Sequence, residues 1–370
     1  MPEGEAPTTP LAVAHTARAT AAPTATLQHH QQWVWGSQIL PHDTEYKYLG
    51  IQLTESCSWD KHTQYIKEKC QKAVWALSSV IFRNRWIDTA IKRIMLLAVI
   101  RPIVEYGATV WHATKPQQSS LEAIQNQTLS RMAGSPNNIN QHILRMDMGC
   151  RSFNSWADQR KLEYFYRLQN MSDDRLPKQV WQHPWLRGRR AGGQSTMWTK
   201  KVQQVAASAD LTMETLEAAC QAARSYTDFK KQMAKKIRTR DLKAAQTQAS
   251  TQPTLARYLQ LLDSSITLHP NSMQPYLSGP KTKGSSLKLQ FRSSTAQVRH
   301  REVLTRRHDV TSSQCPCCQH QDETCQHVVV DCPHYAQLRR QLQRKISELI
   351  GAEKLGKFLA LNSLPSSMQL

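Results

Sequence analysis

The sequence lacks any long apolar run. The longest, Ile94–Ile100, is followed by Arg101 and Pro102 and falls well short of the about 18 residues that a membrane helix needs. The first 32 residues hold eight Ala, six Thr and four Pro, but Arg18 is their only Arg or Lys. This composition resembles neither a signal peptide nor an Arg-rich transit peptide. We therefore expect no membrane partner, and we predict that residues 1–32 form a disordered leader.

Acidic residues are also scarce. The 370 residues include 28 Asp and Glu against 48 Lys and Arg, which leaves a net charge of +20. A charge of this size attracts polyanions, so nucleic acid or an acidic surface is the expected partner. The alternative is a generally basic surface that only keeps the protein soluble. Hydrophobic residues make up 40% of the chain, slightly less than is usual, which indicates some linker or disordered segments.

The nine cysteines are not spread as a disulfide framework would require, because five of them fall between Cys315 and Cys332. Without a signal peptide, such clustering favours a reducing compartment and a metal ion. The spacing Cys315-x2-Cys318-x8-His327-x4-Cys332 offers three thiolates and one imidazole, a ligand set that suits tetrahedral zinc. Four protein ligands leave no open position. The spacing therefore predicts a structural zinc site that folds a small segment.

Neighbouring residues are rivals for this ligand set. Cys317 adjoins Cys318 and cannot easily share its ion, while Cys325 falls between the two predicted ligand pairs. His320 and His334 are two further candidates. A reduced cysteine-rich loop without a metal is the remaining alternative, although it would leave five thiols exposed for no evident reason.

Hydrophobic periodicity predicts a mainly α-helical fold that follows a small N-terminal β-hairpin. The expected strands are Trp33–Leu40 and Glu45–Leu53, joined around Pro41, His42 and Asp43. Three apolar stripes with helical spacing follow. They comprise Ile66, Cys70, Ala73, Val74, Leu77, Val80 and Ile81; then Ile91, Ile94, Met95, Ala98 and Val99, up to a kink or break at Pro102; then Leu121, Ile124, Thr128, Leu129 and Met132. Two later helices are expected at Trp156–Asn170 and His334–Ile350, the second with Tyr335, Leu338, Leu342, Ile346 and Leu349 inward.

Shifts in composition divide the chain into units. Residues 244–286 are rich in Ser, Gln, Thr and Pro, which is typical of a linker, although a short helix could form near Leu255–Leu262. The predicted units are a leader (1–32), a β-hairpin (33–55), a helical domain (56–181), a basic helical connector (182–243), a linker (244–286), a zinc-binding unit (287–352) and a tail (353–370).

Basic residues gather in the connector, just before the zinc ligands and in the helix that follows them. Such clusters suit contact with phosphates, whereas a solvated basic face is the alternative for any one of them. The side chains expected to bind nucleic acid are Arg187, Arg189, Arg190, Lys200, Lys201, Arg292, Arg299, Arg301, Arg339 and Arg340.

A series of short motifs, in a fixed order, resembles one protein family. They are Tyr46-Lys47-Tyr48-Leu49-Gly50-Ile51, Ser58-Trp59 with His62, Arg101-Pro102 with Glu105-Tyr106-Gly107, Val110-Trp111, Arg175-Leu176-Pro177, Cys315-Pro316-x-Cys318, Glu323-Thr324, and Cys332-Pro333 with Arg339. This order resembles the part after the catalytic core of non-LTR (LINE-type) retrotransposon reverse transcriptases, including their terminal zinc-binding segment. The resemblance covers residues 33–185 and 285–345. No single motif is highly specific, but the ordered set is.

The resemblance implies roles for several of these segments. Lys47, Tyr48, Leu49 and Gly50 would correspond to the primer-grip hairpin, which holds the primer end near the active site. The helices from His62 to Met132 would correspond to the thumb, which packs against the template–primer duplex. The implied partners are RNA, an RNA–DNA or DNA duplex, and the remainder of a retroelement polymerase. An intracellular, nuclear location is expected.

The family's catalytic aspartates have no counterpart in this sequence. Polymerisation needs two metal ions held by carboxylates. The family carries its aspartate pair well upstream of the segment that Lys47 begins, where this sequence has only Glu3, Glu5, Asp43 and Glu45. The one Asp-Asp pair, Asp173-Asp174, follows the thumb-like region and fits a loop or a helix cap. We expect no catalytic residue here, and a truncated, C-terminal portion of such a polymerase.

Three hypotheses remain after the sequence analysis. The first is a nucleic-acid-binding C-terminal portion of a reverse transcriptase without polymerase activity of its own. The second is a zinc-stabilised protein-interaction module whose charge keeps it soluble. The third is a polymerase subunit whose active site is completed by another chain.

Overall fold

The computed structural model describes residues 34–39, 43–135, 139–182, 197–261, 273–304, 311–319 and 321–350. Within these ranges the chain is mostly helical, with a small antiparallel hairpin near its N-terminus and a Cys/His cluster toward its C-terminus. The predicted fold class is therefore confirmed. The predicted leader and tail lie outside the described residues. No helix in the described ranges is both long and apolar enough to cross a membrane.

Two short antiparallel hairpins open the described chain. Their strands are β1 (Val34–Trp35) paired with β2 (Gln38–Ile39), and β3 (Glu45–Tyr48) paired with β4 (Ile51–Thr54). The prediction of two long strands joined around Pro41 is wrong, because each expected strand folds back on itself. In the second hairpin, Leu49 and Gly50 have φ values of 45° and 82° and form a two-residue turn. A period-2 pattern continues through such a turn, so the alternation alone could not reveal it.

The first long helix contains a widened turn that rotates its buried face. Helix α1 (Asp60–Leu77) buries Ile66, Cys70 and Val74, as predicted, and passes into the π-helical turn η1 (Ser78–Phe82). Val80 was predicted to lie on the same face but is 65% exposed, whereas Phe82 is buried. A π-helical turn inserts one residue, which moves the apolar register onward.

The second helix buries the face opposite to the predicted one. It consists of α2 (Thr89–Met95), the π-helical turn η2 (Leu96–Ile100) and α3 (Arg101–Glu105), and it continues through Pro102 without a break. The buried side chains are Thr89, Lys92, Leu96, Ile100 and Val104, while Ile91 and Ile94 are half exposed. Every residue from Ile94 to Ile100 is apolar, so periodicity gave no reliable face, and a lysine such as Lys92 is rarely buried.

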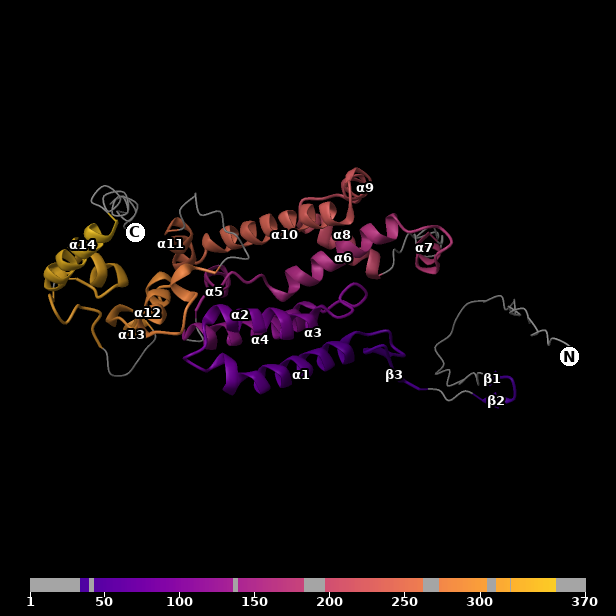
Figure 1. Ribbon diagram of the computed structural model, residues 1–370, viewed down its shortest axis with the longest axis horizontal. Helices are drawn as coiled ribbons and strands as arrows, with labels where there is room; N and C mark the ends of the chain where they lie inside the picture. The colour runs from indigo at the N-terminus through magenta and orange to yellow at the C-terminus, as the bar shows by residue number, and fades with distance from the viewer. Residues whose placement is uncertain are drawn as a thin grey trace, which may run out of the picture.

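Helix α4 (Lys115–Ala133) closes the first core. A capping box of Thr114 and Gln117 begins it, and Gly134, with φ 67°, ends it in the left-handed conformation that glycine permits. Its predicted stripe, Leu121 to Met132, is buried against α1, α2 and η1. The first core therefore lies between α1, the α2–α3 helix and α4, which run side by side in Figure 1.

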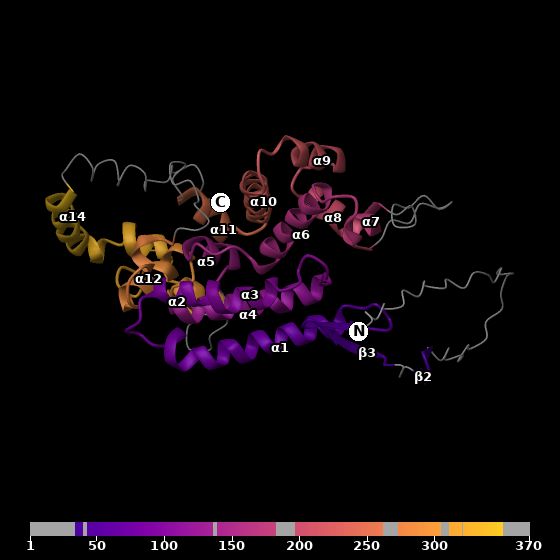
Figure 2. The same cartoon turned by 45° about the vertical axis from the view of Figure 1, so that its right-hand side comes forward.

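A second helical layer covers the first. Its elements are α5 (Gln141–Asp147), α6 (Phe153–Gln169), α7 (Leu176–Gln182), α8 (Met197–Ser208), α9 (Met213–Ala222), α10 (Tyr226–Ala249) and α11 (Pro253–Leu261). Helix α6 contributes Phe153 to the first core and Leu162 and Phe165 to the second, which α8, α9 and α10 complete. Both views place α6 between the first layer and α10 (Figure 1 and Figure 2).

The C-terminal third begins with elements that pack on the first core. They are η3 (Pro275–Leu277) and α12 (Lys283–Arg292), followed by α13 (Arg299–Leu304), η4 (His327–Asp331), η5 (Pro333–Tyr335) and α14 (Ala336–Ile350). Leu277 and Leu289 join the first core. The 244–286 segment, predicted as linker, thus contains the end of α10, all of α11, η3 and the start of α12. The division into domains stays a prediction.

A buried carboxylate ties these distant segments together. Asp147, at the end of α5, is fully buried and accepts hydrogen bonds from the hydroxyls of Tyr258 and Tyr276 at 2.6 and 2.5 Å. The Arg292 guanidinium lies 3.2 Å from both of its oxygens. Because a buried charge must be paired, this network joins α5, α11, η3 and α12.

Candidate functional site

The four predicted metal ligands meet in a compact knuckle near the C-terminus. Gln314 forms an isolated antiparallel bridge with Asp322, and the chain reverses between them. The Cys315 N–H donates to the Gln321 carbonyl, and the Gln319 N–H donates to the Cys315 carbonyl at 2.9 Å. This turn carries Cys315 and Cys318, while the other two residues stand at the two ends of the short helix η4.

The donor atoms have the separation that a tetrahedral ion requires. One ligand atom from each of Cys315, Cys318, His327 and Cys332 lies within 4.8 Å of every other. The Sγ atoms of Cys315 and Cys332 are 3.9 Å apart, and Cys318 Sγ is 3.3 Å from His327 Nε2. Zinc–sulfur bonds at tetrahedral angles place two sulfurs about 3.8 Å apart. The four side chains therefore fit zinc, although the geometry does not identify the metal.

The imidazole is oriented for metal binding by a second contact. His327 Nδ1 lies 3.1 Å from Gln321 Oε1, an acceptor, so the ring carries its proton on Nδ1 and Nε2 keeps its lone pair. That lone pair points to the cluster. Metal-bound histidines are commonly held in this way by an oxygen on the far side of the ring.

The electrostatics of the two buried thiols also favour a cation. Burial raises the pKa of Cys315. Hydrogen bonds from the backbone N–H groups of Cys318 and Cys317 and from the ring of His327 outweigh burial, and the pKa of Cys315 is lowered overall to about 6. The pKa of Cys332 is raised by burial and by its neighbour Cys315. Two adjacent thiolates repel each other, and a divalent ion between them removes that cost.

The rival ligands are separated from this cluster. Cys325 is buried with Ala296 and Val298 in a small apolar cluster. Cys317 is exposed and its Sγ lies 3.3 Å from the Tyr335 hydroxyl. His334 packs its ring on Tyr335, with centroids 5.0 Å apart, and His320 lies outside the described residues.

The ten predicted nucleic-acid contacts divide into three groups. Arg187, Arg189 and Arg190 lie outside the described residues, as does the side chain of Arg301. Lys200 and Arg340 are exposed, while Lys201 and Arg299 are partly exposed. Two arginines have other partners, namely Arg292, which pairs with buried Asp147, and Arg339, whose Nη2 donates to the Cys332 carbonyl at 2.6 Å. We remove these two from the proposed contact surface.

The predicted primer-grip residues form the tip of the β3–β4 hairpin. Tyr48 and Leu49 are 56% and 72% exposed. The Tyr106 hydroxyl donates to the Leu49 carbonyl, and a Cβ on Gly50 would lie 3.1 Å from the Tyr106 ring. Lys47 places its ammonium 4.9 Å from the centre of the Tyr65 ring. The tip is therefore held in place by α1 and by the chain after α3.

A buried histidine fixes the base of the hairpin. His62 is fully buried, and its Nδ1 accepts the N–H of Gln52 at 3.2 Å. Its ring meets the Trp111 ring edge-on, with centroids 5.2 Å apart. Burial lowers the pKa of His62 to about 4, so the ring is neutral at physiological pH. A neutral Nδ1 lone pair is what this hydrogen bond requires.

One known protein resembles part of the chain. It is the "Probable RNA-directed DNA polymerase from transposon BS" of Drosophila melanogaster, with 22% identity over 131 residues. The chain is similar to a reverse transcriptase. The match covers 35% of this chain and 14% of the polymerase, so the chain spans only a small part of that relative. No protein-family model and no solved structure matches the chain.

The helix after the cluster differs from its prediction. Leu338 and Leu342 were expected to face inward but are 60% and 57% exposed. Helix α14 packs mainly on the short helices η4 and η5, which cover little of its apolar stripe. Val329 and Val330 in η4 are also half exposed. Amphipathic spacing correctly indicated an apolar face on α14. It could not show that the rest of the described chain covers little of this face.

Proposed function

We propose that this chain is the C-terminal, nucleic-acid-binding portion of a reverse transcriptase. The similarity to a transposon RNA-directed DNA polymerase carries the proposal. The net charge of +20 supports it, because phosphate contacts supply most of the affinity of nonspecific nucleic-acid binding. The expected ligands are RNA and RNA–DNA or DNA duplexes.

Within this proposal the C-terminal cluster is a structural zinc site. Cys315, Cys318, His327 and Cys332 would hold the ion, and the ion would supply folding free energy instead of chemistry. The spacing of the donor atoms, their burial and the hydrogen bond that orients His327 support this assignment. Arg339 then acts as a support, because it holds the carbonyl of a ligand residue.

The exposed tip of the β3–β4 hairpin is proposed to contact a nucleic-acid strand. Tyr48 and Leu49 are exposed at the tip of the hairpin. This tip is held in place by the contacts with Tyr106 and Tyr65. A rigid, exposed aromatic side chain suits a position beside a sugar or a base. This location agrees with the primer-grip role that the family resemblance implies for Lys47, Tyr48, Leu49 and Gly50.

The chain is proposed to bind without polymerising. Asp173 and Asp174 lie exposed between α6 and α7, where Asp173 accepts a hydrogen bond from Gln182 at 2.8 Å. Hydrogen bonds from the Ser172 hydroxyl and the backbone lower the pKa of Asp174. These contacts are typical of a turn that precedes a helix. Primer extension by the purified chain, with Mg²⁺ and nucleotides, would contradict this part of the proposal.

The main test is the salt dependence of binding. The dissociation constant of the purified chain for an RNA–DNA duplex is measured by fluorescence anisotropy between about 50 and 200 mM salt. A protein that neutralises several phosphates should lose two or more orders of magnitude in affinity over this range. A dissociation constant that barely changes with salt would reject the proposal.

One observation favours a second function for the C-terminal unit. Val329, Val330, Leu338 and Leu342 form exposed apolar surface beside the metal cluster, which is typical of a protein contact. The double variant Cys318→Ser/His327→Ala separates the two functions. If its nucleic-acid affinity equals that of the unmodified chain, the unit does not handle nucleic acid, and loss of a protein contact in the same variant would identify it as a protein-interaction module.

A further inference from the structure

A groove on the first helical layer lies apart from every site described above. It runs between the α1–η1 helix and α4, and its volume is about 470 Å³. A second hollow of about 300 Å³ adjoins it, since Arg83 and Arg131 line both. Lys281 lines the second hollow and lies across Gly134, where a Cβ would collide with its side chain. Three cations therefore converge on one depression.

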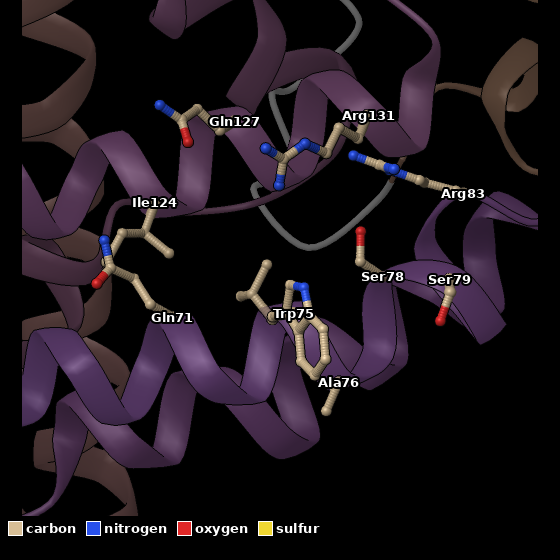
Figure 3. A pocket seen from close by; sticks show the side chains of 10 residues that line it. Gln71, Trp75, Ala76, Ser78, Ser79, Arg83, Ile124, Gln127 and Arg131 are labelled. Atoms are coloured by element: carbon tan, nitrogen blue, oxygen red, sulfur yellow. The ribbon is translucent and has the colours of Figure 1, made fainter.

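None of these cations is paired with a carboxylate in the described chain, although Asp88 forms a β-bridge with Pro280, the residue before Lys281. None of the residues that line the two hollows is acidic. Figure 3 shows the Arg83 side chain, from the end of η1, and the Arg131 side chain, from α4, at the same end of the groove above Ser78. Cations that line one groove without a paired carboxylate favour an anion there, and a phosphate accepts hydrogen bonds from two guanidinium groups.

A buried hydroxyl adds a second sign of a missing ligand. Ser78 is 8% exposed, it lines the groove, and its Oγ has no hydrogen-bond partner in the described chain. In Figure 3 this hydroxyl points toward the space beneath Arg83 and Arg131. A buried polar group without a partner costs free energy, so the position suits an acceptor that comes from outside. Ser78 begins the π-helical turn η1, an irregularity that often accompanies function.

The same groove contains an exposed aromatic ring. Trp75 is 80% exposed, although a tryptophan in a folded domain is normally well covered. It stands one helical turn before Ser78 and Ser79 on the wall of the groove. A row of cations beside an exposed aromatic ring is an arrangement that binds single-stranded nucleic acid. The cations contact the phosphates of the strand, and the ring stacks on a base.

We propose that this groove binds one phosphate of a single-stranded nucleic acid between Arg83 and Arg131, with the Ser78 hydroxyl donating to it and a base against Trp75. The proposal deepens the proposed function and rests on it. A duplex suits the groove less well, because its bases are stacked on each other and offer no free face to Trp75. Lys281 extends the positive track toward the next phosphate.

The test compares variants of the full, metal-loaded chain. Binding of a fluorescein-labelled single-stranded oligothymidylate is measured by anisotropy for Arg83→Ala/Arg131→Ala and for a control, Arg175→Ala/Arg224→Ala. The control removes the same charge from exposed arginines outside the groove. We expect the groove variant to bind at least about tenfold more weakly than the control, since each charge-assisted hydrogen bond to phosphate contributes appreciably. Equal affinities of the two double variants would overturn the proposal.

The aromatic contact is tested separately. Trp75→Ala should lose about fivefold or more in affinity for the single strand, and Trp75→Phe, which keeps a stacking ring, should restore most of it. The loss should be smaller for a blunt duplex of the same length. If Trp75→Ala binds the single strand as well as the unmodified chain, or weakens both probes equally, no base stacks on this ring.

Stability distinguishes the proposal from a purely structural role. The helices α1–η1 and α4 both end at this groove, and cations stabilise helix C-termini. If Arg83→Ala/Arg131→Ala lowers the melting temperature and leaves affinity unchanged, the arginines serve only the helix ends and the proposal is wrong. The charge-preserving Arg83→Lys/Arg131→Lys variant covers the case in which the alanines impair folding, because it should keep the fold and still bind more weakly than the control.

Failure of this inference can be told from failure of the proposed function. If the unmodified chain binds no oligonucleotide and no duplex at low salt, the proposed function itself is wrong. If it binds with the expected salt dependence but the groove variants match their control, only the groove assignment is wrong.

Discussion

Leu129 in α4 and Cys315 in the knuckle are both fully buried, but their neighbours differ. Leu129 lies among apolar side chains from several helices, which exclude water from each other. Cys315 lies among the other three candidate metal ligands. The few apolar residues near them form only a small cluster around Ala296, Val298 and Cys325. The helical block, α1 to α12, therefore carries its own driving force for folding. The C-terminal unit, residues 311–319 and 321–350, lacks one of comparable size.

The two regions should therefore respond to different treatments. Burial of apolar area stabilises the block whether or not a metal is bound. A small segment that buries mainly ligand atoms depends on the ion that these atoms hold.

Metal removal should have the largest effect, and only on the C-terminal unit. Chelation, or Cys332→Ser, should abolish amide protection of residues 311–335, because structural zinc supplies about 10–16 kcal/mol to small sites. Hydrogen exchange detects this loss residue by residue, while elemental analysis should find one zinc per chain before chelation. The α4 and α6 amides should stay protected.

The rival thiol provides the control for metal removal. Cys317→Ser should retain the full metal content and the protection of the unit, because Cys317 is exposed and directed to Tyr335. Loss of the metal in this variant would mean that the ligand set is wrong. A metal-free unit that stays fully protected would remove the contrast between the two regions altogether.

A cavity in the second core should destabilise the helical block and leave the C-terminal unit unchanged. Phe165→Ala should reduce the free energy of unfolding of the block by about 3–5 kcal/mol, because Phe165 is fully buried and packs on Trp181 and α8. Its metal content should not change. Denaturant unfolding followed by circular dichroism measures the loss. Leu338→Ala, at an exposed site on α14, serves as the control and should stay within about 0.5 kcal/mol of the unmodified chain.

Acid should weaken the attachment of the hairpin by a smaller amount. The pKa of His62 is about 4 in the folded chain against 6.5 in an unfolded one, so the unfolded state binds a proton first as the pH falls. Stability that is present above pH 6.5 is lost progressively toward pH 4, by at most about 3 kcal/mol.

His62→Asn provides the reference for this titration. The asparagine does not titrate, so the difference in unfolding free energy between the variant and the unmodified chain should change with pH only in this window. All other titratable groups are the same in both proteins, so their contributions cancel. A difference that stays constant from pH 7 to pH 4 would show that His62 is not held neutral by its surroundings.

Some elements could be predicted because their signals are local. The stripe of α4 and the capping residues at its two ends specify one helix with one buried face. The spacing from Cys315 to Cys332 brings four donors together because two tight turns leave few other arrangements. In both cases the deciding contacts lie within about twenty residues of each other.

Other elements could not be predicted because distant partners decide them. The α2–α3 helix is apolar on nearly all sides, so only its position against α1 and α4 determined that Leu96 and Ile100 are buried and Ile94 is exposed. The π-helical turns at η1 and η2 shift the register by one residue and have no local signature. Charged residues are rarely buried, yet Lys92 and Asp147 both are, and only their surroundings in the fold explain this.

By itself, the sequence determined that this protein is mainly helical, strongly basic and able to gather three thiols and an imidazole at one point. Those properties depend on composition and on short spacings. Only the tertiary structure decided which arginines are free to meet a phosphate: Arg292 pairs with Asp147, whereas Arg83 and Arg131 share a groove with Trp75. The reason is physical. Formal charge belongs to a residue, but its availability depends on neighbours that come from distant parts of the chain.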